Sequence, residues 1–321
     1  MSNSSGSKAT WFFAKYGAGI VLLVLFAALS FLSDTFRTLP NLINVARQVS
    51  INAIIAAGMT FIIITGGIDL SVGSLVALSG CIAMMVIQAT GSSIVGVLAG
   101  LVFGGIAGAF NGAMSAWAKI PPFIVTLASL TIFRGTALII TGGTPIIMFE
   151  GEFRVLGQGY LLGIPVPVIL MIIVILIMHI VLTRTSFGAH VSAVGGNEEA
   201  SRLSGIKVPQ VKFKVYIIGG ILTSLSGMIL MGRLSSAQPN TGEGFELDAI
   251  ASVILGGTSL MGGRGSIGGT IVGALIIGIL NNGFNLLAVD AHFQLVAKGI
   301  IILLAVLLDQ YIKGSSKSSP R

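Results

Sequence analysis

The sequence predicts an all-α polytopic membrane protein with about ten transmembrane helices, some of them broken or re-entrant. Of its 321 residues, 54% are hydrophobic and only 9% are charged, whereas a soluble domain carries about a quarter charged residues. The mean hydropathy is +0.99. The chain also contains 44 glycines, about twice the usual share, and glycine is common where membrane helices pack closely.

Ten apolar runs reach or approach the roughly 20 residues that cross a bilayer. They are residues 16–32, 49–66, 72–90, 94–117, 121–141, 165–183, 214–232, 249–262, 267–289 and 293–309. The run 249–262 is short and broken by glycine, and the limits of 72–90 are soft, so eight or nine spans remain an alternative. Lys8 and Lys15 precede the first run as in a signal peptide. That run is long and ends without a small-residue cleavage site, so we expect an uncleaved span.

The distribution of basic residues predicts the orientation, because lysine and arginine collect in cytoplasmic loops. With ten spans and a cytoplasmic N-terminus, the cytoplasmic segments hold Lys8, Lys15, Lys119, Arg184, Arg202, Lys207, Lys212, Lys214, Arg264, Lys313, Lys317 and Arg321. The outer segments hold only Arg37, Arg47, Arg154 and Arg233. We therefore expect both termini to be cytoplasmic, with tails at 1–15 and 313–321. Residues 16–312 would form a single transmembrane domain, because no polar stretch is long enough to bury a core of its own.

The longest charged gap between apolar runs lies in the predicted cytoplasmic loop 184–213 and reads GGNEEASRLSGIKVP. This stretch predicts a short helix with Asn197 as its N-cap, so that Glu198 and Glu199 lie at the positive end of the helix dipole. Gly205 is suited to the left-handed conformation that ends a helix, and a proline follows it. A compact charged helix between membrane spans indicates a contact with something in water.

A second polar segment, ITGGIDLSVGS, carries Asp69, Ser71 and Gly73 within an apolar region. An acidic residue beside an interrupted span is costly unless it is paired or lines an aqueous cavity. One interpretation is therefore a place in a translocation path or at a gate. The other, which we favour, is a carboxylate that caps a helix starting near Ser71 at the membrane edge. The two roles are compatible.

The segment 233–269 is polar in its first half, where Pro239 and Gly242 predict a loop. Glu246 and Asp248 then begin a short apolar run, and Asp248 belongs to the candidate path. The glycine-rich stretch that follows, GGTSLMGGRGSIGG, predicts either a broken helix whose backbone lines the path or a hairpin of two short helices.

Three asparagines, Asn281, Asn282 and Asn285, lie near the outer end of the ninth run. Asn281 and Asn285 share a helix face. All three are candidates for bonding the hydroxyls of a sugar in the path, but asparagine in membranes more commonly bonds a neighbouring helix. Arg134 interrupts the fifth run, and we expect it to snorkel or to pair with a carboxylate.

A weak internal similarity relates residues 51–76 to residues 247–272. Aligned without gaps, the two segments share alanine, isoleucine, valine and three glycines, including Gly66 with Gly262. Transporters often contain repeated halves, but in so biased a composition these matches are too few to define the fold.

Several functional classes lack their motifs. No phosphate-binding loop is present, since GGRGS lacks the Lys-Ser/Thr ending. His179, His190 and His292 stand apart from other metal ligands, and no nucleophile and base are assembled. No interleaved aromatic and basic patch indicates nucleic-acid binding. The few acids within the spans give little support for a proton relay, so energy for uphill transport would come from another subunit.

These landmarks together resemble the membrane permeases of the bacterial ribose ABC importers. The resemblance runs from about residue 40 to residue 312. It rests on TGGIDLSVGS, GGNEEASRLSGIKV, RLSSAQP, ELDAIASVILGGTSLMGGRGSIGGTIVGALIIG and LNNGFNLL. Similar permeases carry xylose, galactose, allose and the autoinducer-2 signal, so the family is better specified than the solute.

The resemblance implies a type II ABC importer permease in the bacterial inner membrane. Two copies would form the channel, and two ATPase subunits that bind ATP and Mg would dock on the cytoplasmic side, leaving this chain without a cofactor. A periplasmic or lipid-anchored binding protein would deliver the sugar. The family's coupling helix maps onto Asn197 to Gly205, where Glu198, Glu199 and Arg202 would contact the ATPase. A merely solvated loop helix is the alternative for these residues.

Other classes of protein remain open at this point. An ion-coupled secondary transporter, a passive channel or structural subunit, and a membrane enzyme are each compatible with a polytopic chain. The missing catalytic constellation argues against the enzyme. A neutral sugar needs only glycines, hydroxyls and amides along its path, which agrees with the scarcity of charge within the spans.

Overall fold

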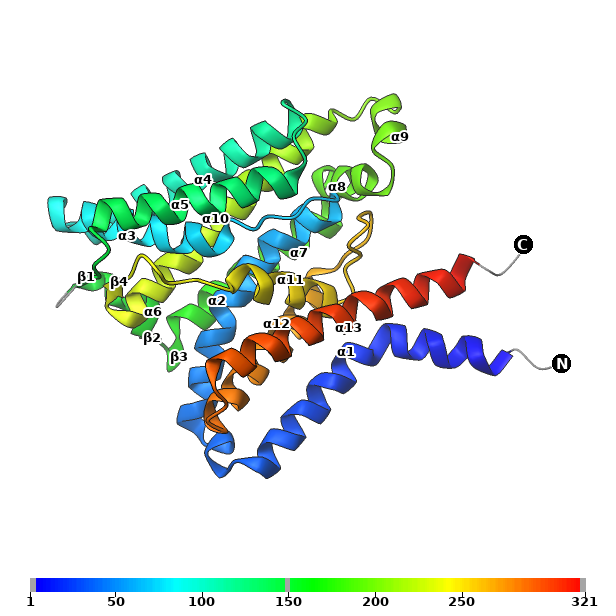
Figure 1. Cartoon of the computed structure of the whole chain (residues 1–321), viewed down its shortest axis with the longest axis horizontal. Helices are drawn as coiled ribbons and strands as arrows, with labels where there is room; N and C mark the ends of the chain where they lie inside the picture. The colour runs from blue at the N-terminus through cyan, green and yellow to red at the C-terminus, as the bar shows by residue number, and fades with distance from the viewer. Residues whose placement is uncertain (1–3, 148–150, 318–321) are drawn as a thin grey trace.

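A computed structural model describes residues 4–147 and 151–317, and most of these residues lie in helices (Figure 1). The principal helices are α1 (Ser4–Leu32), α2 (Leu39–Ile64), α3 (Val72–Thr90), α4 (Ser93–Ala116), α5 (Pro122–Thr141), α7 (Val166–Arg184), α10 (Val208–Leu234), α11 (Phe245–Leu255), α12 (Ile267–Leu286) and α13 (Ala291–Lys317). Each of the ten apolar runs falls on one of them. Within the described ranges, α2, α3, α4, α5, α7, α10 and α12 are long and apolar enough to cross a membrane. The predicted fold class is confirmed.

Two helices that begin earlier than their apolar runs do so at a proline. α2 starts at Leu39 and α10 at Val208, and each has a proline in its first turn. Proline is favoured there because its missing N–H has no helical partner to lose and its φ suits a helix. Pro209 therefore begins α10 in addition to separating it from the segment before it.

The run 249–262 forms a half-length helix rather than a full span. α11 has 11 residues, which extend about 16 Å against a hydrocarbon core of about 30 Å. It ends where Gly257 takes a φ of +85°, and a loop leads to the full-length α12. The half-length α11 packs against α12 across this glycine-rich loop, so the segment is a hairpin in which only the first helix is short. That its backbone lines a path stays a prediction.

The core is built around α2 and α10, whose most apolar windows are 83% and 78% buried. α4 packs along α10, and α12 packs along α2, while α3 and α11 flank these pairs. The close approach depends on glycine: a Cβ on Gly58 of α2 would lie 3.0 Å from the Cα of Gly219 on α10. A Cβ on Gly108 of α4 would lie 2.2 Å from the carbonyl oxygen of Tyr216 on α10.

α2 and α10 are antiparallel neighbours at the centre of this packing. α2 ends beside α8 and α10 begins after α9, so the two helices run in opposite directions (Figure 1). The weak similarity of 51–76 to 247–272 aligns α2 with α11 and α3 with α12. Gly66 and Gly262 share a φ of +80°, but α2 and α11 differ in length, so the similarity does not define the fold.

One end of the molecule carries the segments predicted to be outside. Strand β1 (Ile146–Ile147) pairs antiparallel with β4 (Ser236–Ala237), and β2 (Tyr160–Leu161) pairs with β3 (Ile164–Pro165). η2 (Glu152–Arg154) and α6 (Val155–Gln158) complete this end; a further short helix, η1 (Asp34–Arg37), connects α1 to α2. Since β1 and β4 belong to different loops that touch, both loops lie on the same side, as the charge distribution predicts.

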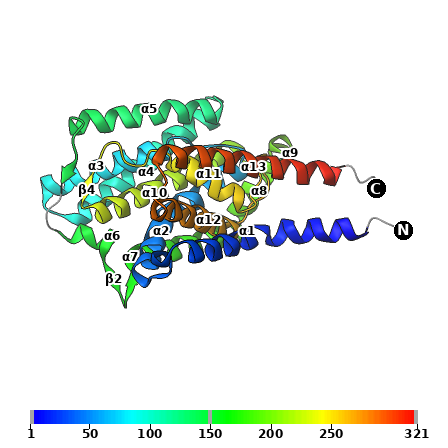
Figure 2. The same ribbon diagram turned by 60° about the horizontal axis from the view of Figure 1, so that its bottom comes forward.

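The opposite end carries α8 (Ser186–Gly196) and α9 (Glu198–Leu203), and the N-terminal end of α1 and the C-terminal end of α13 point the same way (Figures 1 and 2). The loop 184–213 is thus largely helical. The sequence predicted α9 but not α8, in which glycine, serine and valine, all weak helix formers, outnumber the two alanines.

Candidate functional site

The short helix α9 has the predicted caps. The side-chain oxygen of Asn197 accepts the backbone N–H of Ala200 at 2.9 Å. At the other end Gly205 has a φ of +85°, and the N–H of Ile206 bonds the carbonyl of Ser201 at 3.0 Å. These local bonds define α9 within a charged loop.

The charged residues of α9 have two different environments. Glu198 reaches back to α10, where the Nζ of Lys212 lies 2.6 Å from its Oε2. Glu199 and Arg202 instead pair with each other on the surface, with Nε to Oε2 at 3.0 Å, and this hydrogen bond holds the pKa of the Glu199 carboxyl below its usual value. Glu198 therefore anchors the helix, while Glu199 and Arg202 face outward.

Leu203 adds an apolar side chain to the outward face of α9. It is 76% exposed and lies next to Arg202. The sequence analysis did not identify Leu203, because a single leucine in a polar loop forms no pattern. Its exposure follows from its position in the capped helix α9.

Asp69 lies in a buried hydrogen-bond network before α3. Its Oδ1 accepts the backbone N–H of Ser71 at 2.8 Å and the Ser71 hydroxyl at 2.6 Å. The amide of Asn111 on α4 donates to the Ser71 oxygen at 3.0 Å, and Ser129 on α5 donates to Asn111 at 2.5 Å. The carboxylate thus closes the turn in front of α3 and, through Ser71, joins it to α4 and α5. It bonds Ser71, the N-cap residue, and no N–H of the helix itself, so it supports the helix start without being its cap. Its role in a path or gate stays a prediction.

Gly73 lies under the loop that follows α10. A Cβ there would be 2.2 Å from the carbonyl oxygen of Gly242, so the loop backbone rests directly on α3. Arg134 of α5 holds the same loop by donating to the carbonyls of Pro239 and Thr241. Its hydrogen bonds go to backbone carbonyls and not to a carboxylate, while a side chain that reaches this loop from its helix agrees with the expectation of snorkelling.

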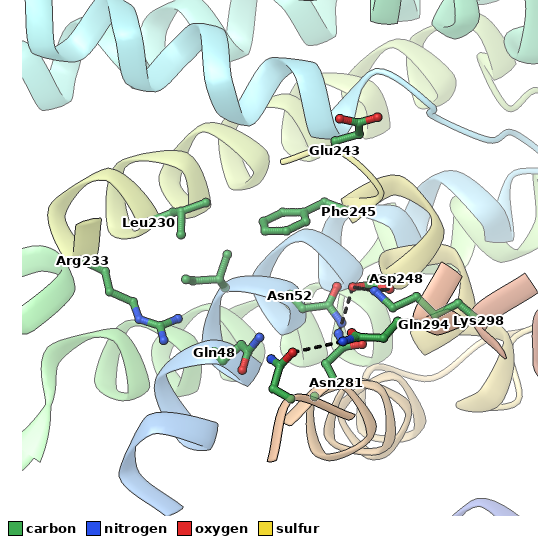
Figure 3. A pocket seen from close by; sticks show the side chains of 13 residues that line it. Gln48, Asn52, Leu230, Arg233, Glu243, Phe245, Asp248, Asn281, Gln294 and Lys298 are labelled. Carbon is green, nitrogen blue, oxygen red and sulfur yellow. Dashed lines mark hydrogen bonds and ion pairs between the residues drawn. The ribbon is translucent and has the colours of Figure 1, made fainter. Parts of the chain in front are cut away.

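A polar cavity of about 250 Å³ lies among α2, α10, α11, α12 and α13 (Figure 3). Its lining residues are Gln48, Ile51, Asn52, Leu230, Arg233, Glu243, Phe245, Asp248, Gly278, Asn281, Asn285, Gln294 and Lys298. It brings together candidate residues that the sequence separates. We call it the α11–α13 cavity.

Asp248 is the centre of the polar network in this cavity. The Nζ of Lys298 lies 2.9 Å from its Oδ1, and both side chains are largely buried. The amide of Asn281 donates to its Oδ2 at 3.1 Å. A buried carboxylate is tolerated when it is paired and hydrogen-bonded in this way.

The three asparagines differ in whether they line the cavity, where they could bond a sugar, or bond a neighbouring helix. Asn281 and Asn285 line the cavity, and Asn285 accepts from Gln294 at 3.2 Å. Asn282 does not line it; its amide and that of Asn41 on α2 donate to each other at 2.9 and 3.1 Å. Asn282 therefore bonds a neighbouring helix.

The sequence analysis missed Gln48, Asn52 and Lys298. Gln48 and Asn52 lie four residues apart on α2 and so share a face, a polar pair in an apolar run that was a usable signal. Lys298 lies in the last apolar run, where nothing in the local sequence indicates its partner on α11.

The seven long apolar helices of the described residues indicate a multi-pass membrane protein, and the polar cavity lies within its helical packing. Comparison with known proteins specifies it further. The family model described as branched-chain amino acid transport system / permease component matches residues 41–306, and the chain belongs to this permease family.

The chain is similar to several curated permeases. It is 49% identical over 298 residues, 92% of each chain, to the ribose import permease protein RbsC of Bacillus subtilis (strain 168). It is 49% identical over 294 residues, 90% of this chain and 92% of the relative, to that of Escherichia coli (strain K12). It is 40% identical over 303 residues, 94% and 93%, to the D-allose transport system permease protein AlsC of Escherichia coli (strain K12). No solved structure matches. The resemblance to ribose permeases inferred from the motifs is confirmed.

Proposed function

We propose that this chain is the membrane-spanning permease subunit of an ATP-driven importer that takes up D-ribose. The observation that carries the proposal is the 49% identity to ribose import permeases over about nine tenths of both chains. The identity falls to 40% for the D-allose permease, which favours ribose and makes allose the second candidate.

The importer contains partners that this chain lacks. A second copy completes the channel, an ATPase subunit binds ATP and Mg, and a periplasmic or lipid-anchored binding protein delivers the sugar from outside. This chain has no cofactor and no enzymatic activity of its own. It lies in the bacterial inner membrane among lipid, with both termini and α9 cytoplasmic, and it binds no nucleic acid.

The ATPase docks on α9, the coupling helix. Its outward face offers Glu199, Arg202 and the exposed Leu203, a charged pair beside an apolar contact, while Glu198 fixes the helix to Lys212. A helix anchored on one side and exposed on the other transmits a displacement of its partner to the transmembrane domain. This geometry favours docking over a merely solvated loop helix.

The displacement reaches the broken helices through α8. A Cβ on Gly195 would lie 1.6 Å from the carbonyl oxygen of Ile64 at the end of α2, so the two backbones are in direct contact. When ATP binding closes the ATPase subunits, α9 and α8 move together and shift the end of α2. The two permease halves then rock to open the path to one side of the membrane.

Uptake of labelled D-ribose tests the proposal. Cells without any second ribose system should accumulate ribose only when they carry this chain with its ATPase and binding protein, and unlabelled allose, xylose, galactose or arabinose should compete weakly. Uptake that survives ATP depletion and collapses with an ionophore would instead identify a secondary transporter. If deletion of the chain left ribose uptake unchanged but abolished uptake of another sugar, that sugar would be assigned as the solute in place of ribose.

A further inference from the structure

The α11–α13 cavity carries no net charge. Its lining includes two basic residues, Arg233 and Lys298, and two acidic residues, Glu243 and Asp248. Lys298 is also paired directly with Asp248. This pair is largely buried, so an ionic solute beside it would bring a charge of its own that the pair does not match, which is costly. The cavity therefore suits an uncharged molecule.

One unpaired acceptor in this cavity is the Oδ1 of Asn52. The Nδ2 of Asn52 donates to the hydroxyl oxygen of Ser252 at 2.8 Å, and that hydroxyl donates its own proton to the carbonyl of Asp248 at 2.6 Å. The proton of the Ser252 hydroxyl is already donated, so a flipped Asn52 amide would place its Oδ1 against the Ser252 oxygen without a hydrogen between them. The amide orientation is therefore fixed. Oδ1 is then buried without a hydrogen-bond partner among the described residues.

A second unpaired acceptor is the Oδ1 of Asn281. Its Nδ2 donates to the Asp248 carboxylate, and an ionised carboxylate only accepts, so this amide is also held in one orientation. Its Oδ1 is likewise buried and unpartnered in the part of the chain that the structure describes. Buried polar groups are almost always hydrogen-bonded in folded proteins. We therefore expect a bound molecule to donate a hydrogen bond to each of these two oxygens.

We propose that the α11–α13 cavity is a solute site within a single subunit, where hydroxyl groups of one neutral monosaccharide donate to Asn52 and Asn281. The inference rests on the proposed function and adds where the solute is held. A sugar hydroxyl supplies the missing donors, and Gln48 and Gln294 at the rim offer further amides (Figure 3).

Three features restrict the ligand class. The two fixed acceptors require O–H or N–H donors. The balanced charge disfavours phosphorylated and carboxylated solutes. The volume of about 250 Å³ lies just below the range for drug-sized ligands, which begins at about 300 Å³, so one sugar ring fits and a disaccharide does not. The Asp248–Lys298 pair positions Asn281, and hence its acceptor, through the bond from the Asn281 amide to the carboxylate.

The test measures D-ribose binding by saturation-transfer NMR to the permease–ATPase complex in lipid nanodiscs, without the binding protein. The variants are Asn52→Leu and Asn281→Leu. The control is Asn41→Leu, which removes an amide from the same helix as Asn52 but outside the cavity. Loss of one hydrogen bond is expected to weaken ribose binding about three- to tenfold in each cavity variant. The control should keep wild-type affinity, and ribose 5-phosphate should not compete.

Two results separate this inference from the proposed function. Wild-type ribose uptake and binding that persist unchanged in both folded cavity variants would overturn the site and leave the ribose permease intact. Absence of ribose uptake, with allose or another neutral sugar binding in a manner sensitive to Asn52 and Asn281, would overturn ribose and support the site. Binding of ribose 5-phosphate as tightly as ribose would overturn the assignment to neutral solutes.

Discussion

The backbone N–H of Gly263 donates to the carbonyl oxygen of Ile64 at 2.9 Å, which joins the loop between α11 and α12 to the end of α2. Gly195 of α8 packs on the same carbonyl. The end of α2, the loop between α11 and α12, and α8 therefore meet at the carbonyl of Ile64. Their backbones are in direct contact there, with no side chain between them.

Replacing Gly195 with alanine should disrupt this junction. Its Cβ would lie 1.6 Å from the carbonyl oxygen of Ile64, and backbone cannot move aside as a flexible side chain does. We expect the thermal midpoint to fall by about 5 °C or more and ribose uptake to fall with it. The control is Gly196→Ala, because a Cβ there meets nothing within 4 Å. Equal stability and uptake in the two variants would contradict the junction.

The Glu199–Arg202 pair supports a charge-swap test of the coupling helix. Glu199→Arg with Arg202→Glu keeps a salt bridge within α9 but reverses the charges that face the ATPase. If the pair only stabilises a solvated helix, the swap should restore what Glu199→Ala and Arg202→Ala lose. If it contacts the ATPase, as we propose, the swap should still reduce ATPase docking and sugar uptake at least tenfold, measured by co-purification and transport.

Neighbouring Glu198 gives this test its control. Glu198 bonds Lys212 on α10 at 2.6 Å, whereas Glu199 bonds Arg202 within α9. Glu198→Gln should leave docking affinity within about twofold, since exposed ion pairs contribute little to stability. Docking that depends on Glu198 more than on Glu199 would reverse the assignment of the two faces.

Arg134 should control the mobility of the outer loop that contains Pro239 and Thr241. Arg134→Met removes both hydrogen bonds from the guanidinium to the two carbonyls but keeps an apolar side chain of similar length. We expect faster amide hydrogen exchange across residues 238–244, by about tenfold, because the loop is then held mainly by its contact with Gly73. Thr131→Ala, one turn away with an exposed side chain, should not change the exchange. An unchanged loop in Arg134→Met would show that Gly73 alone holds it.

The features that the sequence predicts well are those set by local physics. Asn197 and Gly205 act on backbone groups within one turn, so their types and spacing were enough to define α9. The apolar runs likewise located each long helix, because burial in lipid depends on length and composition. The half-length of α11 could be predicted only in part from the sequence, because a broken helix and a hairpin have the same glycine-rich composition.

The parts that the sequence did not predict depend on packing between distant segments. Asp248 meets Asn281 and Lys298, which are 33 and 50 residues away, on two other helices. No local pattern indicates which face of α13 turns toward α11. The carbonyl partners of Arg134 were not predicted for the same reason: they belong to a loop more than 100 residues later.

The reciprocal amide pair of Asn41 and Asn282 should stabilise the contact between α2 and α12. Asn41→Leu leaves the buried Asn282 amide unpaired, at a cost of about 1–3 kcal/mol. Asn282→Leu should cost less, because the Asn41 amide keeps its bond to the carbonyl of Phe36. Replacing both removes the unpaired groups together, so the double variant should lose less than the sum of the single losses. The coupling energy should be about 0.6 to 1.7 kcal/mol, the range for hydrogen bonds between membrane helices. Reversible unfolding of the reconstituted chain gives the four free energies, and strictly additive losses would mean that the two amides do not interact.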